Sequence, residues 1–217
     1  RHLPFALFVL ALASLVIALG RPVASVTVPI GQSTIILAVD VSLSMCSTDI
    51  HPNRLAAAQA AALSYIRRQE PTTQIGIVAF AGFAALTQPP TTDQEALQAA
   101  VESLATSHRT AIGSAILKSL DAIAEVNQNV APSVSGVASG DQITPVPNGD
   151  YAPDIIVLLS DGANNVGPLP LDAAQQAVER GVRVHTIGFG TEDGATMDCS
   201  QQFQESDLFG GSDQQLG

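Results

Sequence analysis

The sequence predicts an α/β domain built on a doubly wound, mainly parallel β-sheet. Short apolar runs rich in β-branched residues alternate along the chain with longer segments in which apolar residues recur every three or four positions. The first pattern is typical of strands that are buried on both faces, and the second is typical of helices that cover a sheet. Their alternation predicts parallel strands joined by helical crossovers.

The first apolar segment, residues 3–19, differs from the others. It contains one polar residue, Ser14, and basic residues flank it at both ends. About 17 to 18 apolar residues is the lower bound for a bilayer-spanning helix. We therefore expect residues 1–20 to form a transmembrane helix or signal anchor, followed by a linker at 21–32. A cleaved signal peptide and a buried core helix are the alternatives.

The remaining elements follow in order along the chain. Strand-like runs occupy residues 33–39, 74–80, 84–87, 154–159 and 182–188. Helical patterns occupy residues 53–69, 111–126 and 171–180. A further helical pattern, between the first two of these, opens with the capping box Thr92–Glu95. The domain should therefore span residues 33–190. Residues 127–153 should form a structureless insertion, and residues 191–217 a polar, disordered tail.

Composition and charge narrow the classes of function. The 217 residues suffice for one such domain with a sizeable core. The formal net charge of −11 argues against nucleic-acid binding and against simple adsorption to anionic lipid. A cation, or a partner with basic surface around its contact residue, fits better. Cys46 and Cys199 lack metal-type spacing, so a disulfide and two unrelated thiols both stay open.

Oxygen-bearing side chains gather where the predicted strands end. The motif D-V-S-L-S, with Asp40, Ser42 and Ser44, follows the first strand, and Asp161 follows the fourth. Thr110 opens the third helix. The carboxyl ends of neighbouring parallel strands share one edge of a sheet, where ligands bind. These hard oxygen ligands suit Mg²⁺. The alternatives are a helix N-cap for Thr110 and a turn-former for Asp161.

These residues resemble the metal-ion-dependent adhesion site of the von Willebrand factor A domain. The matching segments are D-V-S-L-S-M at Asp40, T-A-I-G-S-A-I at Thr110 and L-L-S-D-G around Asp161. The P-N-R-L and G-I-V-A-F-A-G segments at 52–55 and 76–82 are similar to bacterial, membrane-anchored A domains of the aerotolerance (Bat-like) type. The resemblance implies a Rossmann-like A-domain fold.

The resemblance also implies a function. Mg²⁺, with Mn²⁺ or Ca²⁺ as substitutes, would be bound directly by Ser42, Ser44 and Thr110. Asp40 and Asp161 would act through water and orient the hydroxyls. An Asp or Glu of a partner protein would complete the coordination shell. The chain would then be a membrane-anchored binding module with its A domain outside the cytoplasm. It would work with other A-domain membrane proteins and a MoxR-type AAA+ ATPase.

An adhesin-type receptor and a Mg²⁺-dependent phosphohydrolase are the alternatives. A phosphoryl-accepting Asp40 would need a second aspartate at position 42, which is serine. The sequence contains neither a phosphate-binding loop nor a nucleophile elbow. It also offers no base placed to activate water beside the ion. We therefore expect a binding protein without catalytic residues.

Overall fold

The computed structural model describes residues 2–19, 33–133, 151–191 and 194–199. The chain divides into two compact units, Arg1–Gly31 and Gln32–Gly217, which are described separately. The first contains helix α1 (Leu3–Leu19), a single apolar helix of 17 residues. None of the described helices is both long and apolar enough to cross a membrane. The expected transmembrane helix at residues 1–20 is thus not supported.

The second unit contains a five-stranded sheet in the order β3-β2-β1-β4-β5. Its strands are β1 (Thr34–Asp40), β2 (Gln74–Phe80), β3 (Ala84–Thr91), β4 (Ile155–Ser160) and β5 (Arg183–Gly188). The central strand β1 pairs in parallel with β2 and β4, and β4 pairs in parallel with β5. Only β3 among these strands is antiparallel, at an edge that tolerates its prolines. The predicted α/β sheet is confirmed as a mixed sheet.

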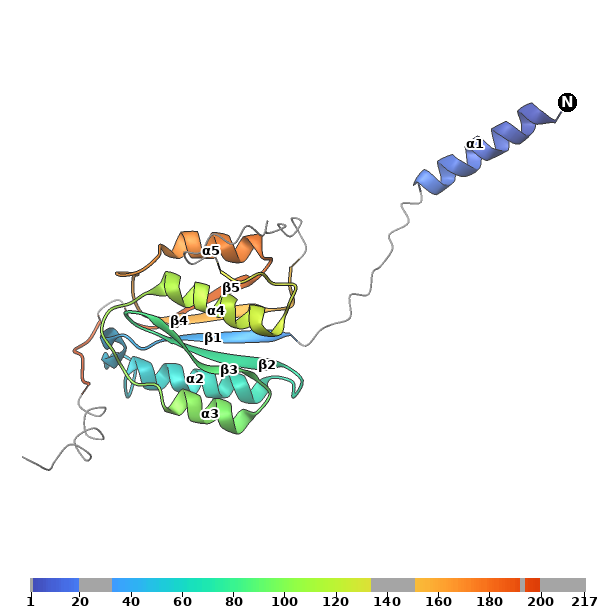
Figure 1. Ribbon diagram of the computed structural model, residues 1–217. Coiled ribbons are helices and arrows are strands. Elements are labelled where there is room, and N and C mark those ends of the chain that lie inside the picture. The colour runs from blue at the N-terminus through green and yellow to red at the C-terminus, as the bar shows by residue number, and fades with distance from the viewer. Residues whose placement is uncertain (1, 20–32, 134–150, 192–193, 200–217) are drawn as a thin grey trace, which may run out of the picture. The chain divides into compact units, whose positions relative to one another are not determined.

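Helices cover both faces of this sheet (Figure 1). They are α2 (Arg54–Arg68), α3 (Gln94–Glu102), α4 (Ile112–Val126) and α5 (Pro170–Glu179), with a short 3₁₀ helix, η1 (Leu43–Cys46), after β1. Alternate residues of β1 enter two separate cores: Leu37 and Val39 pack with α2 and α3, whereas Ile36 and Ala38 pack with α4 and α5. The strand is apolar from Ile35 to Val39 because both of its faces are buried.

One helix begins one residue later than its motif predicts. The N-cap of α3 is Asp93, whose Oδ1 accepts hydrogen bonds from the backbone N–H groups of Glu95 and Ala96. The Thr91 hydroxyl in turn accepts from the Asp93 backbone N–H at 3.1 Å. The predicted capping box starting at Thr92 is therefore wrong. Both residues are good caps, and the carboxylate is the one placed to reach two amides.

Two segments expected to lack structure are partly ordered. At the start of the insertion, Val130 is buried, and the Arg180 guanidinium donates to the carbonyls of Ala131 and Pro132 at 2.9 and 2.8 Å. In the expected tail, residues 194–199 pair with the chain just after η1, for example through a bridge between Ser47 and Met197. The rest of the insertion, the linker and the rest of the tail lie largely outside the described residues.

Candidate metal-binding site

The candidate site lies at the edge of the sheet where β1 and β4 end. Asp40 is the last residue of β1, and Asp161 directly follows β4. Asp40 is fully buried: its Oδ1 accepts from the Ser42 backbone N–H at 2.8 Å, and its Oδ2 accepts from the Ser160 hydroxyl at 2.5 Å. Burial raises the pKa of Asp40, and these hydrogen bonds from Ser160 and Ser42 oppose the rise.

Hydroxyl groups connect this carboxylate to the second one. The Oγ atoms of Ser42 and Ser44 lie 2.9 Å apart, and Ser44 Oγ donates to Asp161 Oδ1 at 2.8 Å. Asp40, Ser42, Ser44 and Asp161 therefore form one hydrogen-bonded group of oxygen atoms, which we call the oxygen cluster. Ser44 lies within η1, and Ser42 is the N-cap residue of that helix.

Thr110, the fifth predicted residue, is buried in the connection between α3 and α4. Its backbone N–H donates to Asn165 Oδ1 at 2.9 Å, and its carbonyl accepts from the Asn165 N–H at 3.0 Å. Nearby, Ser107 forms a bridge with Ser42. The backbone around Thr110 is thus joined to both loops of the oxygen cluster. Among the described residues, however, no hydrogen bond links the Thr110 hydroxyl to the cluster itself.

The helix-cap alternative for Thr110 is wrong. The N-cap position of α4 belongs to Ala111, and no side chain caps that helix. The conformation of Thr110 is instead fixed by its backbone contacts with the loop that follows β4. Its side chain is therefore not needed to begin the helix.

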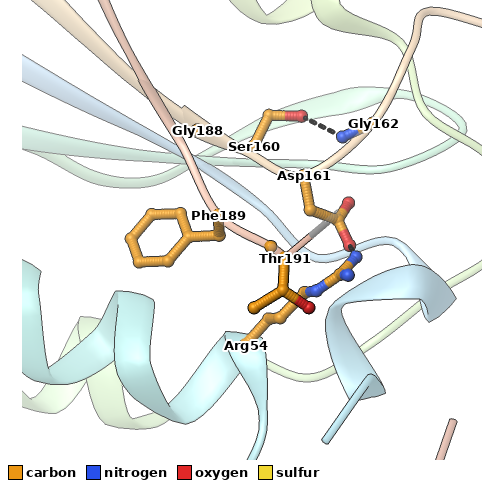
Figure 2. Close-up of a pocket in the computed structure, with 8 residues that line it drawn as sticks. Arg54, Ser160, Asp161, Gly162, Gly188, Phe189 and Thr191 are labelled. Atoms are coloured by element: carbon orange, nitrogen blue, oxygen red, sulfur yellow. Dashed lines mark hydrogen bonds and ion pairs between the residues drawn. The ribbon is translucent and has the colours of Figure 1, made fainter. Parts of the chain in front are cut away.

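Two further residues, an arginine and an aspartate outside the predicted set, lie next to the oxygen cluster. Arg54, the first residue of α2, donates from Nε and Nη2 to the two oxygens of Asp49 at 2.8 and 2.7 Å. Its Nη1 donates to Asp161 Oδ2 at 2.7 Å (Figure 2). Hydrogen bonding between the two groups lowers the pKa of Asp49 and raises that of Arg54. The P-N-R-L segment contained Arg54, but nothing in the sequence pointed to Asp49.

A pocket of about 590 Å³ opens beside this arrangement. Figure 2 shows Arg54 reaching toward Asp161 on one side of it, with Phe189 on another. The pocket is lined by the loop after β4, by the end of β5 and by α2, through Arg54, Ser160, Asp161, Gly162, Gly188, Phe189, Gly190 and Thr191. Side chains of a bound partner would therefore find space directly next to Asp161.

A disulfide lies immediately beyond η1. Cys46, two residues after Ser44, is bonded to Cys199, and their Cα atoms are 5.2 Å apart. The backbone N–H of Asp198 donates to the Cys46 carbonyl at 3.1 Å, and that of Thr48 donates to the Thr196 carbonyl at 3.3 Å. Of the two alternatives that the sequence left open, the structure has the disulfide. It fastens residues 194–199 to the loop that carries the serines.

The donor atoms of the cluster fit a hard divalent cation. Two carboxylates stand among hydroxyl groups, and no group of three or more His, Cys, Asp or Glu side chains suited to a metal occurs in the described part of the chain. Neutral and anionic oxygens without nitrogen or sulfur favour Mg²⁺ or Mn²⁺ over Zn²⁺. The cluster is small, and its hydroxyls can turn their lone pairs toward an ion.

Comparison with known proteins identifies the family. The family model described as "von Willebrand factor type A domain" matches residues 35–164, which include all five predicted site residues. The chain belongs to the von Willebrand factor type A domain family. A UPF0353 protein of Mycolicibacterium vanbaalenii is 36% identical over 197 residues, covering 88% of this chain and 54% of the relative. The chain thus spans about half the length of the curated relatives it matches.

Two solved structures are similar to this A domain. BatB from Bacteroides thetaiotaomicron, described as a conserved hypothetical protein, superposes with a TM-score of 0.57 at 25% identity, covering 76% of this chain and 70% of that chain. An aerotolerance-related membrane protein from Bacteroides fragilis gives 0.59 at 26% identity, covering 77% and 73%. The predicted likeness to Bat-type A-domain proteins is confirmed.

Proposed function

We propose that this A domain binds a divalent cation, preferentially Mg²⁺, and uses it to capture an acidic side chain of a partner protein. The residues that would hold the cation are Asp40, Ser42, Ser44, Thr110 and Asp161. The observation that supports this proposal best is the hydrogen-bonded chain from Ser42 through Ser44 to Asp161 at the carboxyl edge of the sheet. This chain supports the proposal because it brings oxygen atoms of two separate loops together.

Each residue of the cluster has a distinct part in this proposal. The buried Asp40 fixes the loop, because it accepts hydrogen bonds from the Ser42 backbone and from Ser160. Asp161 accepts a hydrogen bond from the Ser44 hydroxyl, which in turn accepts from Ser42 and keeps one lone pair free. Bound there, Mg²⁺ would supply a Lewis-acidic centre that needs about six oxygen ligands, so that an outside carboxylate could complete its shell. This is an interaction role and requires no catalytic residue.

Metal titration tests the proposal directly. We expect Mn²⁺, followed by electron paramagnetic resonance of the free ion, to fill one saturable site from which Mg²⁺ displaces it. Asp40→Ala and Asp161→Ala should each weaken binding about 10-fold or more. Glu125→Ala, which removes an exposed carboxylate near the end of α4, is the matched control and should bind normally. Unchanged binding in both site variants would contradict the assignment.

We also propose that the chain acts at a membrane, with its A domain in an oxidising compartment outside the cytoplasm. The likeness to an aerotolerance-related membrane protein supports the first part. The Cys46–Cys199 disulfide supports the second, because such bonds persist mainly outside the reducing cytosol. Thiol labelling of intact cells tests the location: after reduction, an impermeant reagent should reach these cysteines.

On the resemblance to Bat-like proteins, we propose that the partners are other A-domain membrane proteins and a MoxR-type AAA+ ATPase. Affinity capture of the full chain from native membranes should recover the ATPase together with other A-domain membrane proteins. Recovery of an extracellular ligand without an ATPase would favour an adhesin instead. Mg²⁺-dependent turnover on a panel of phosphoesters, abolished in Asp40→Ala, would contradict a purely binding role.

A further inference from the structure

We propose that Arg54 is a positioning residue of the metal site. It holds the Asp161 carboxylate in the orientation in which Oδ1 accepts the Ser44 hydroxyl, while Asp49 compensates its charge. This inference rests on the proposed function and adds two residues that lie outside its five-residue motif. Its basis is the geometry of the guanidinium and of the groups around it.

The guanidinium is fixed by hydrogen bonds from three of its nitrogens. Nε and Nη2 donate to the two oxygens of Asp49, and Nη1 donates to Asp161 Oδ2 at 2.7 Å. The side chains of Arg54, Asp49 and Asp161 are only 11%, 3% and 0% exposed. A planar fork bonded to two carboxylates cannot turn without breaking several charge-assisted hydrogen bonds. The orientation of Asp161 is therefore set by Arg54.

The two oxygens of Asp161 have separate partners. Oδ2 accepts from Arg54, which leaves Oδ1 for the Ser44 hydroxyl at 2.8 Å. Since Ser44 donates its only proton to Oδ1, it accepts from the Ser42 hydroxyl, and its second lone pair stays available to an ion. Without the arginine, the carboxylate could rotate about its terminal torsion, which has a broad minimum. The Ser44 proton could then turn toward the position where a cation must bind.

Asp49 keeps the arginine from repelling that cation. A lone guanidinium beside a cation site would oppose binding, whereas the Arg54–Asp49 pair carries no net charge. The pair is itself held by the segment that follows β5. The Thr191 N–H and hydroxyl donate to Asp49 Oδ2 at 2.8 and 3.1 Å. Gly190 has φ of +138°, and a Cβ there would lie 3.1 Å from Arg54 Nη2, so its backbone closes against the guanidinium.

A charge-neutral double variant separates positioning from charge. Arg54→Gln combined with Asp49→Asn removes one positive and one negative charge and leaves the net charge unchanged. If only charge mattered, the variant would bind Mn²⁺ like the unsubstituted chain. Positioning predicts that the dissociation constant for Mn²⁺ rises about 10-fold or more, as is typical when support for metal ligands is lost. The Arg68→Gln/Glu70→Gln pair, exposed and near the other end of α2, is the matched control.

Binding is measured on the whole chain, well below the melting temperature of each variant, so that a loss of stability alone does not change the dissociation constant. Arg54→Lys provides a second test if the double variant does not fold. Lysine keeps the charge but cannot hold both carboxylates with a planar fork, so weaker binding is again expected. Unchanged affinity in the double variant, or in Arg54→Lys where the double variant fails to fold, would overturn the role of Arg54 and leave the metal site standing. Failure of the unsubstituted chain to bind Mn²⁺ would overturn both.

Discussion

Removing the disulfide should destabilise the A domain measurably. Cys46 and Cys199 are separated by 153 positions, so their bond closes a loop that includes every strand of the sheet except β1. The loss of loop entropy in the unfolded chain corresponds to about 5 kcal/mol at 25 °C in the chain-entropy model. The Cys46→Ser/Cys199→Ser double variant removes this constraint without placing a large group in the structure.

The expected loss is smaller than this upper value. Without the bond, residues 194–199 are held mainly by backbone hydrogen bonds such as Asp198 N–H to the Cys46 carbonyl, each contributing about 1 kcal/mol. The segment can then detach locally, which returns conformational entropy to the folded state. We therefore expect the free energy of unfolding to fall by about 2–4 kcal/mol.

Urea unfolding followed by circular dichroism provides the assay. The variant should unfold at lower urea and with a larger m-value, because its unfolded chain is less compact. Reductant should move the unsubstituted chain to the midpoint of the variant and leave the variant unchanged. Equal midpoints for the two oxidised proteins, or two titratable thiols in the unreduced chain, would refute this reasoning.

Four further perturbations give independent tests. Asp154→Ala should cost about 1–3 kcal/mol in urea unfolding, because the fully buried carboxylate accepts from the Thr34 N–H at 2.8 Å and that amide would lose its partner. Gly113→Ala should cost about 1–3 kcal/mol, because its Cβ would lie 2.2 Å from a backbone oxygen. Gly162→Ala, whose Cβ would meet nothing within 4 Å, should cost less than about 0.5 kcal/mol. Since the folded pKa of Asp49 lies below its ordinary value of 3.8, its stabilisation is present above that pH and is lost as the pH falls below it. Asp49→Asn should therefore flatten the acid limb of stability against pH, and a limb as steep as that of the unsubstituted chain would contradict this.

The fold could be predicted because its determinants are local. In the strand Thr34–Asp40, the five residues between the first and the last are apolar. The structure buries both faces of this strand. Where two neighbouring residues could play the same part, the sequence could not decide between them. Thr92 and Asp93 are both suitable caps, and the choice depends on which side chain the turn after β3 directs toward the helix.

The candidate site was predictable only where it depends on strand ends. The spacing of Asp40, Ser42 and Ser44 and the position of Asp161 after a strand follow from the sheet. Arg54 and Asp161 are 107 positions apart in the sequence, and no pattern of apolar residues predicts that their side chains are hydrogen-bonded. Composition was misleading for residues 194–199, where a polar segment that suggested disorder is held by a covalent bond and by backbone pairing.

The net charge of the oxygen cluster and its neighbours bears on which ion it would bind. The Arg54 guanidinium lies between the carboxylates of Asp49 and Asp161, and the buried Asp40 carboxylate is linked to Asp161 through Ser42 and Ser44. When all are ionised, three negative charges against one positive charge leave an excess of two negative charges. Removal from water raises the pKa of Asp40, and the charge of Asp161 adds a smaller contribution to the rise. A divalent cation carries the charge that would balance the excess, whereas a monovalent ion would leave half of the excess. The charge balance thus favours the same class of ion as the oxygen ligands.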